Sequence, residues 1–274
     1  MNKKYLILIV IYNETIDESL TYKSLLGSSK YLNNSKLVIW DNSKISQKMN
    51  KNKISFFDEI EYIHTPENLS LSKIYNKVIQ LNNGFGYMII LDQDSSFSIN
   101  YFQEIEKATA ENKDINLFLP IVKSSNTIVS PGNYKIFKGS YWKKEKYGKI
   151  NSKDILAINS GMVINFNYLR NLFTGYDERL RFYGTDTFFM LNYSEHNKYI
   201  YIINYILEHD SALLNKNESI EKILKREREL LNAWILVNEN NKFHLLLTYI
   251  YTIYKTVKLS LKYRTTKLIR GLIR

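Results

Sequence analysis

Two aspartates separated by one residue, in Asp92-Gln93-Asp94, directly follow the apolar run Tyr87–Leu91. Such a run predicts a buried strand, and open α/β sheets bind their ligands at the carboxyl ends of strands. Because side chains alternate along a strand, we expect Asp92 and Asp94 to point to one side. Carboxylate oxygens are preferred ligands of Mg²⁺ and Mn²⁺, and diphosphate oxygens and water would complete the coordination. The alternative is an ordinary turn, in which Asp and Ser are common.

Polar groups also follow two earlier apolar runs. Asp41-Asn42-Ser43 comes after Leu37–Trp40, and Tyr12-Asn13-Glu14 comes after Tyr5–Ile11. An aspartate at position 41 could accept a hydrogen bond from a nucleobase imide or a ribose, and a tyrosine at position 12 could stack on a base. Each motif could instead be a plain turn, or a Tyr that caps the core. Three strand ends with such groups on one edge favour a binding site.

Alternating apolar runs and helical patterns position these motifs. Further strands are predicted at Tyr62–His64 and Asn116–Val122, and helices at Leu71–Ile79 and Ile99–Ala110. Ser70 or Ser72 can cap the first of these helices. This order is typical of βαβ units, so the predicted fold class is α/β, with a mostly parallel central sheet flanked by helices.

The pattern weakens from Lys123 to Asp154, which we interpret as loops and short strands around a site. Regular structure is predicted again over Ile155–Ile164, in a helix near Gly184–His196 and in a strand at Tyr199–Tyr205, and after Asn215 the chain reads as helices only. We therefore expect a catalytic domain over 1–215, divided into 1–122 and 123–215, and C-terminal helices over 216–274.

Composition and missing motifs exclude several kinds of chemistry. The 274 residues contain no Cys, which excludes disulfides, thiolate nucleophiles and Cys-ligated metals. Lys and Arg number 38 against 27 Asp and Glu, a net charge of +11 that suits an anionic partner. Gly84-Phe-Gly86 precedes a strand instead of opening a helix, so a Rossmann dinucleotide site is not expected. P-loop, G-x-S-x-G and H-E-x-x-H motifs are also missing, which leaves carboxylate chemistry.

The C-terminal segment is basic and amphipathic. From residue 242 onward it contains eight Lys and Arg and no Asp or Glu, interleaved with an apolar face that includes Leu246, Ile250, Ile253, Val257 and Leu261. This pattern is typical of a helix that lies in a membrane interface near anionic lipid. The alternatives are a helix packed on the catalytic domain or a dimer contact. No apolar run reaches the roughly 20 residues of a membrane span, so no transmembrane helix is predicted.

Four segments together resemble the successive signatures of family 2 inverting glycosyltransferases with the GT-A fold: Ile9–Glu14, Val38–Ser43, Glu67–Asn76 and Ile89–Ser95. The L-D-Q-D-S form of the last segment is similar to that of bacterial rhamnosyltransferases, whose donor is dTDP-L-rhamnose. The likeness covers roughly residues 5–211, more loosely after Lys123. It implies a nucleotide-sugar donor, Mn²⁺ or Mg²⁺, and a saccharide or lipid-linked acceptor for cell-surface polysaccharide.

The resemblance also implies roles for individual residues. Donor binding is carried over to Tyr12, Asn13, Glu14, Asp41, Asn68, Lys73 and Asp92. Metal binding is carried over to Asp94 and His209, with Asp92 close by. Asp186, in the segment Asp177–Asp186, corresponds to the base that deprotonates the acceptor hydroxyl, with Asp177 the next candidate. Thr185 is a departure, since a second acid often precedes the base. A single displacement with one base would invert the anomeric centre.

Other functions stay open at this point. Within the same fold, the donor could be a UDP-sugar, such as UDP-galactose, UDP-galactofuranose or a UDP-N-acetylhexosamine. A nucleotidyltransferase would need a Gly-rich basic motif after the first strand, which Tyr12-Asn13-Glu14 lacks. A nucleic-acid-binding protein would use the positive charge, but uncompensated carboxylates at the strand ends would repel phosphates. We therefore expect no nucleic-acid partner. We also expect the protein to be cytoplasmic and peripheral on the membrane. The oligomeric state is not predicted.

Overall fold

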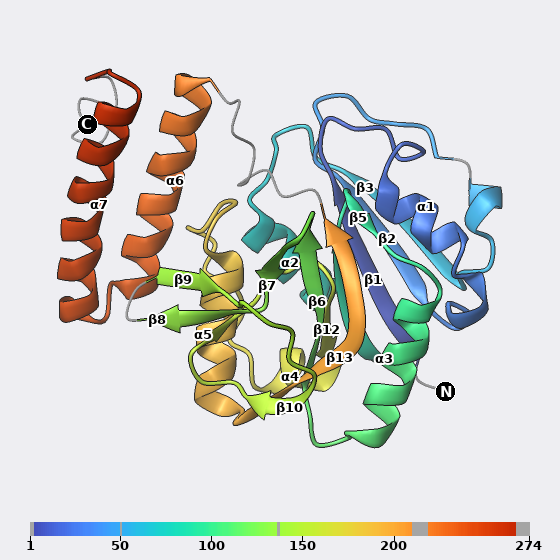
Figure 1. Cartoon of the computed structure of the whole chain (residues 1–274). Coiled ribbons are helices and arrows are strands. Elements are labelled where there is room, and N and C mark those ends of the chain that lie inside the picture. The colour runs from blue at the N-terminus through green and yellow to red at the C-terminus, as the bar shows by residue number, and fades with distance from the viewer. Residues whose placement is uncertain (1–2, 50, 136–137, 210–218, 267–274) are drawn as a thin grey trace.

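The computed structural model describes residues 3–49, 51–135, 138–209 and 219–266 (Figure 1). Within these ranges the chain forms a ten-stranded sheet, a three-stranded sheet and a hairpin of two long helices at one end of the molecule. Strand order in the large sheet is β10-β13-β6-β12-β4-β1-β2-β3, and β5 pairs with β13 and β7 with β6. The predicted α/β class is therefore confirmed.

The first half of the chain forms the parallel part of the sheet. It comprises β1 (Lys3–Ile11), β2 (Lys36–Asp41), β3 (Glu59–His64) and β4 (Phe85–Asp92), which pair in parallel as β3-β2-β1-β4. On the other side, β6 (Leu117–Ser124) is parallel to β13 (Tyr199–His209). Between the two parallel groups lies β12 (Met162–Asn165), which runs antiparallel to both neighbours. Because β12 is antiparallel to both β4 and β6, all six of these parallel strands run in one direction and end at the same edge of the sheet.

Helices cover both faces of the sheet. Alternate residues of β1 point to opposite faces, so Leu6 and Leu8 belong to one core cluster and Ile7 and Ile9 to the other. The first cluster is completed by α2 (Leu71–Leu81), α4 (Phe166–Asn171) and α5 (Thr185–His196). The second is completed by α1 (Leu20–Leu26) and α3 (Asn100–Glu111). A two-sided core explains why the strands are continuous apolar runs.

The predicted elements agree with the structure, with two exceptions. The two short helices α1 and α4 were not predicted, because seven and six residues give too little periodicity. The expected continuous element over Ile155–Ile164 is also wrong. The chain forms β11 (Ile155–Leu156), then a turn at Asn159-Ser160-Gly161, and only then β12. Ser70 is the cap of α2, since its hydroxyl accepts a hydrogen bond from Lys73 N.

Short strands form most of the segment from 124 to 156. The small sheet has the order β11-β8-β9, and the remaining strands extend the large sheet. The short strands of this segment not yet given are β7 (Thr127–Ser130), β8 (Gly132–Lys135), β9 (Lys138–Tyr141) and β10 (Gly148–Asn151). One further short strand, β5 (Ser95–Ser96), lies earlier in the chain. Two 3-10 turns, Ser29–Tyr31 and Lys51–Ile54, flank β2 and lie between the first strands.

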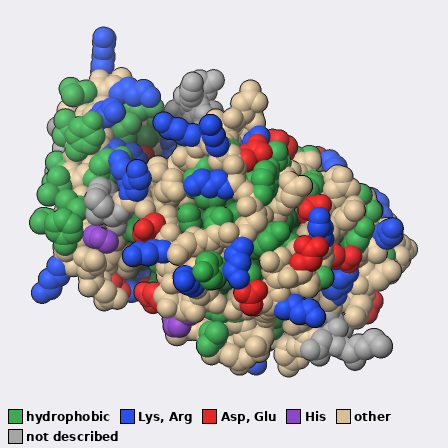
Figure 2. Space-filling model, turned by 60° about the horizontal axis from the view of Figure 1, so that its bottom comes forward, with side chains coloured by type: hydrophobic (Ala, Val, Ile, Leu, Met, Phe, Trp, Pro, Cys, Tyr) green, Lys and Arg blue, Asp and Glu red, His purple; other side chains and the backbone are tan. Residues whose placement is uncertain are grey.

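The C-terminal hairpin consists of α6 (Ile220–Asn238) and α7 (Lys242–Lys262). It stands beside the sheet domain, with α6 between that domain and α7 (Figure 1). Hydrophobic side chains gather on the surface at this end of the molecule, on the left of Figure 2. The domain boundary expected near residue 215 lies outside the described residues. No helix in the described part of the chain is long and apolar enough to cross a membrane.

Gly161 holds the turn that opens β12. Its φ is +82°, a conformation that L side chains rarely adopt, and a Cβ added there would lie 2.7 Å from Cγ of the buried Pro120. Gly161 N donates to Ile90 O at 2.8 Å, and Gly161 O accepts a hydrogen bond from the Tyr101 hydroxyl. The residue therefore fixes how β12 enters the sheet beside β4.

We predict that Gly161→Ala lowers the free energy of unfolding by about 2–5 kcal/mol, since it adds backbone strain and an overpacked contact with Pro120. Gly84→Ala is the matched control. Gly84 also has a positive φ, +75°, but a Cβ there would meet no atom within 4 Å. It should lose only about 1–2 kcal/mol from backbone strain. Urea denaturation of both variants measures the difference, and equal losses would contradict the steric argument.

Candidate active site

The three strand ends singled out in the sequence meet at one edge of the sheet. In the parallel register Ile11 lies opposite Asp41, and Val10 lies opposite Asp92. The loops after these strands are tied together, because Tyr12 N donates to Gln93 Oε1 at 2.7 Å and Asn13 N donates to Ser43 Oγ at 2.9 Å. The structure thus brings together the β1, β2 and β4 ends as predicted.

The Asp41 side chain is buried below this edge of the sheet and does not lie on its surface. The residue is fully buried, and its carboxylate accepts hydrogen bonds from the Tyr62 hydroxyl at 2.6 Å and from Ser43 N at 2.9 Å. Burial, with the bond to Asp41, raises the pKa of Tyr62 to about 12. Each oxygen of the Asp41 carboxylate has a second lone pair. A hydrogen bond from a nucleotide-sugar donor would have to use it. Its donor role stays a prediction.

The Asp92–Asp94 segment is a turn, so the expectation that one pleat directs both carboxylates is wrong. β4 ends at Asp92, and Gln93 and Asp94 form the turn into β5. Asp92 N donates to Ser160 Oγ at 3.1 Å, and the Ser19 hydroxyl donates to Gln93 O at 2.7 Å. The turn is therefore held from the β12 side and from α1, and both aspartates are half-buried.

Glu14 faces the same turn. Its Oε2 atom is buried and makes no hydrogen bond to the described protein atoms. Burial, followed by the negative charges of Asp94 and Glu18, raises the pKa of the Glu14 carboxyl. A divalent cation would relieve this repulsion between hard-oxygen groups, so the residues present fit Mg²⁺ or Mn²⁺.

The protein supplies only part of a coordination sphere here. Among the described residues, no group of three or more His, Asp or Glu is arranged to hold a metal ion. The remaining ligands would be oxygens of a diphosphate and water, as expected for Mg²⁺. His209 ends β13, and its backbone lies opposite Ser95, the residue directly after the Gln93-Asp94 turn. Its role as a ligand stays a prediction, and Asp210 and Ser211 lie outside the described residues.

Asp186 lies in the first turn of α5, near Tyr75 of α2. The charges of Asp92 and Asp186 both raise the pKa of the buried Tyr75 hydroxyl, after the larger effect of burial, so both carboxylates lie near it. Burial also raises the pKa of Asp186, against hydrogen bonds from Thr187, whose N donates to Oδ1 at 2.7 Å. A carboxylate with a raised pKa is a stronger base than an ordinary one.

The other candidate base has the opposite environment. The Arg179 guanidinium donates to both oxygens of Asp177, with Nη2 to Oδ2 at 2.6 Å, and it lowers the pKa of that carboxyl. Thr185, which stands where the family often has an acid, is buried and accepts a hydrogen bond from Asn159 Nδ2 at 3.0 Å. Asp177 is therefore paired with Arg179, and Thr185 has a structural contact. Which of Asp186 and Asp177 is the base stays a prediction.

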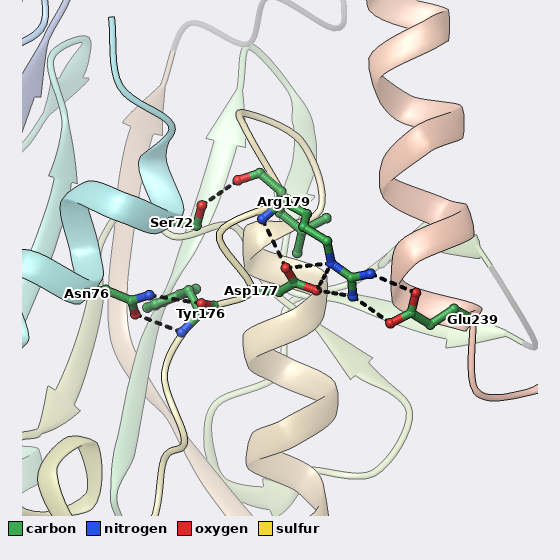
Figure 3. Close-up of polar contacts among 7 residues, drawn as sticks. Ser72, Asn76, Tyr176, Asp177, Arg179 and Glu239 are labelled. Carbon is green, nitrogen blue, oxygen red and sulfur yellow. Dashed lines mark hydrogen bonds and ion pairs between the residues drawn. The ribbon is translucent and has the colours of Figure 1, made fainter.

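Helix α2 holds the loop that leads to Asp186 (Figure 3). Asn76 Nδ2 donates to Tyr176 O at 2.9 Å, and Tyr176 N donates to Asn76 Oδ1 at 2.8 Å. The Ser72 hydroxyl donates to Leu180 O, and Leu71 N donates to Arg181 O at 2.8 Å. Helix α2 thus fixes the loop that precedes Asp186.

The same loop is held from the other side by α6. Arg179 bridges Asp177 and Glu239, with Nη1 donating to Glu239 Oε2 at 3.0 Å (Figure 3). Gly184, whose φ is +83°, comes so close to α6 that an added Cβ would lie 2.8 Å from Ala233 Cβ. The hairpin therefore packs directly on the residue that begins α5.

Two predicted donor residues lie at the start of α2. Asn68 has a φ of +51° and accepts a hydrogen bond from Asn42 Nδ2 at 2.9 Å, which links the β2 end to the loop before the helix. Lys73 is exposed in the first helical turn. The donor roles of Asn68 and Lys73 stay predictions.

Sequence reasoning missed Tyr75, Ser160 and Asn159. The helical pattern treats Tyr75 as one of its apolar positions. The Tyr75 hydroxyl also hydrogen-bonds Asn159 and lies near the carboxylates of Asp92 and Asp186. Ser160 and Asn159 were placed inside a regular element, which hid the turn that aims them at β4 and α5. The dipeptide Ser-Gly at 160–161 was the one turn signal that could have shown this.

We predict that Asn76→Ala lowers the free energy of unfolding by about 1–3 kcal/mol, because it removes both bonds to the Tyr176 backbone. Hydrogen exchange over residues 175–184 should also become faster. Lys77→Ala, at an exposed position of the same helix, is the control and should change stability by less than about 0.5 kcal/mol. Unchanged exchange in the Asn76 variant would show that α2 does not hold the loop.

Comparisons with known proteins identify the family and the fold. The family model described as glycosyl transferase family 2 matches residues 6–173. The structure resembles TarS 1–349 of S. aureus at a TM-score of 0.55 and 14% identity, over 88% of this chain and 74% of that one. It also resembles GalNAc-T7 solved with UDP, GalNAc and Mn²⁺, at a TM-score of 0.61 and 15% identity, over 86% of this chain and 47% of that one. No curated protein matches by sequence.

The match covers the β1, β2 and β4 ends and stops before Asp186. At 14% and 15% identity the structural likenesses concern the fold, which is that of GT-A glycosyltransferases. More than half of the chain is matched by the family model. The chain therefore belongs to glycosyl transferase family 2 and is a glycosyltransferase with the GT-A fold.

Proposed function

We propose that this glycosyltransferase is a metal-dependent, inverting enzyme that transfers L-rhamnose from dTDP-L-rhamnose to a saccharide or lipid-linked acceptor in bacterial cell-surface polysaccharide synthesis. One observation carries the mechanism. Glu14, Asp92 and Asp94 gather at one sheet edge, and Asp92 and Asp186 both lie near the Tyr75 hydroxyl. Carboxylates for a diphosphate-bound cation and a separate carboxylate for a proton are the two requirements of this chemistry.

The chain's own residues divide the work. Asp186 takes the proton of the attacking hydroxyl, and its raised pKa suits that task. Asn159 fixes Thr185 next to it, and α2 and α6 hold the loop before it. With a single base and no enzymic nucleophile assigned, one in-line displacement inverts the anomeric carbon.

Asp94 and Glu14, with Asp92 beside them, would hold the cation against the donor diphosphate. When bound, Mn²⁺ or Mg²⁺ supplies Lewis-acid stabilisation of the charge on the leaving diphosphate. Tyr12 is 47% exposed at the β1 end, where its ring is free to stack on a base. The hydrogen bond from Tyr12 N to Gln93 Oε1 links the residue that carries this ring to the turn at Gln93-Asp94.

The donor assignment rests on the L-D-Q-D-S form at 91–95. The alternative is a UDP-sugar, and one finding favours it. TarS has been solved with UDP and with UDP-GlcNAc, and GalNAc-T7 with UDP and GalNAc. A nucleic-acid-binding role is the remaining alternative from another class, and it would show as retention on nucleic acid with a steep salt dependence.

Release of nucleoside diphosphate from a panel of dTDP- and UDP-sugars, with and without Mn²⁺ or Mg²⁺, tests donor and metal together. We expect turnover of dTDP-L-rhamnose that stops with a chelator. Asp94→Asn should abolish turnover and weaken metal-dependent nucleotide binding, whereas Asp58→Asn, away from the edge, should not. Turnover of a UDP-sugar alone would overturn the donor, and metal-independent turnover would overturn the metal assignment.

We predict that Asp186→Asn lowers kcat by about 10²–10⁴, because the proton acceptor is lost while the side chain keeps its shape. Donor affinity, measured by calorimetry, should stay within about twofold. Asp177→Asn is the control and should retain most activity. In the parent enzyme, the base is active only when deprotonated, so kcat should fall as the pH drops through a pKa above that of an ordinary Asp. A collapse of donor affinity would move Asp186 to the donor site.

A further inference from the structure

Helix α7 has its polarity reversed relative to an ordinary packed helix. Thr248, Thr256 and Ser260 are its buried residues. Its large apolar side chains face outward, with Leu261 75% and Ile253 66% exposed. The other exposed members of this apolar face are Phe243, Leu246, Tyr249, Ile250, Tyr254 and Val257. An amphipathic helix that only packed on its own domain would bury the apolar side instead.

The inward side of α7 packs on α6, and Lys138 of β9 lies over its Tyr251 ring. Lys255 Nζ lies 2.7 Å from Glu227 Oε2, and the rings of Tyr251 and Trp234 are 5.8 Å apart. The threonine hydroxyls bond the helix itself, since Thr248 Oγ1 donates to His244 O and Thr252 Oγ1 to Thr248 O, both at 2.8 Å. The bond to His244 O lets Thr248 be buried at little cost. The fold therefore does not need the apolar face for its own packing.

The charges around this face are of one sign. Lys258, Lys262 and Arg264 are exposed at the C-terminal end of α7, and Lys258 Nζ lies 5.9 Å from the Tyr254 ring centroid. The sequence has no acidic residue from 242 onward. Lys267, Arg270 and Arg274, also basic, lie outside the described residues. An apolar face bordered only by cations matches the apolar interior and anionic headgroups of a lipid surface.

We infer that the exposed face of α7 is a docking surface for an anionic membrane, on which the helix lies flat. A second copy of the chain is the competing occupant. A symmetric pair formed through this face would bring Lys258 and Lys262 against another α7 that carries no acid, so charge disfavours it. Exposed tyrosines on the same face suit the headgroup level of a bilayer.

The inference deepens the proposed function, because it names the surface at which a lipid-linked acceptor would be met. Its evidence is separate, since it uses no residue of the carboxylate site. In Figure 1 the C-terminal end of α7 lies on the side toward which β6 and β13 point. The basic end of the helix and the carboxyl edge of the sheet therefore face the same side of the molecule.

Vesicle co-sedimentation of the full chain tests the inference at low salt. We expect binding to phosphatidylglycerol vesicles and little binding to phosphatidylcholine. A variant with Lys258→Gln, Lys262→Gln and Arg264→Gln should bind about 100-fold more weakly, taking about 1 kcal/mol per charge. The matched control removes three exposed charges from the opposite side, through Lys30→Gln, Lys107→Gln and Lys113→Gln, and should bind normally.

A second variant isolates the apolar contribution. Ile250→Ser with Ile253→Ser changes two exposed side chains, so the melting temperature should hold while vesicle binding falls. Analytical ultracentrifugation without lipid checks the competing occupant. Failure of the parent chain to bind anionic vesicles, or a dimer that the Ile variant dissociates, overturns the inference. Release of nucleoside diphosphate in solution is scored separately, so a failed anchor and a failed donor assignment give different results.

Discussion

Parallel pairing of β1 with β2 and β4 is the constraint on which the site depends. Hydrogen bonding in that register fixes where the three strands end, and each strand is followed at once by polar residues. Glu14 and Asp94 are thereby brought close enough for one charge to raise the pKa of the other carboxyl. The packed, two-sided apolar core holds the two carboxylates in place despite their repulsion. A cation at this edge would relieve that repulsion.

Local pattern was enough to predict the parallel half of the fold and the gathering of its strand ends. Apolar runs such as 5–11 and 87–91 are buried on both faces, so a single sequence shows them clearly. The helix at Leu71–Leu81 was equally visible from its period and its serine cap. The strands before the motifs at 12–14, 41–43 and 92–94 were enough to predict that these motifs meet at one edge.

What pattern could not predict depends on contacts between distant residues. Asn76 and Tyr176 lie 100 residues apart, and no local signal links them. Asp92 and Asp94 were expected to share a pleat, but Ser19 and Ser160 hold the segment as a turn. The reversed polarity of α7 was likewise hidden, since the sequence shows an amphipathic helix without showing which side α6 covers.

Helix α6 touches both α7 and the start of α5. On one side Glu227 pairs with Lys255 of α7, and on the other Ala233 meets Gly184 and Glu239 meets Arg179. These contacts form a continuous path from α7 through α6 to Gly184, two residues before Asp186. A displacement of the last helix would therefore reach the amino end of α5 through packed side chains.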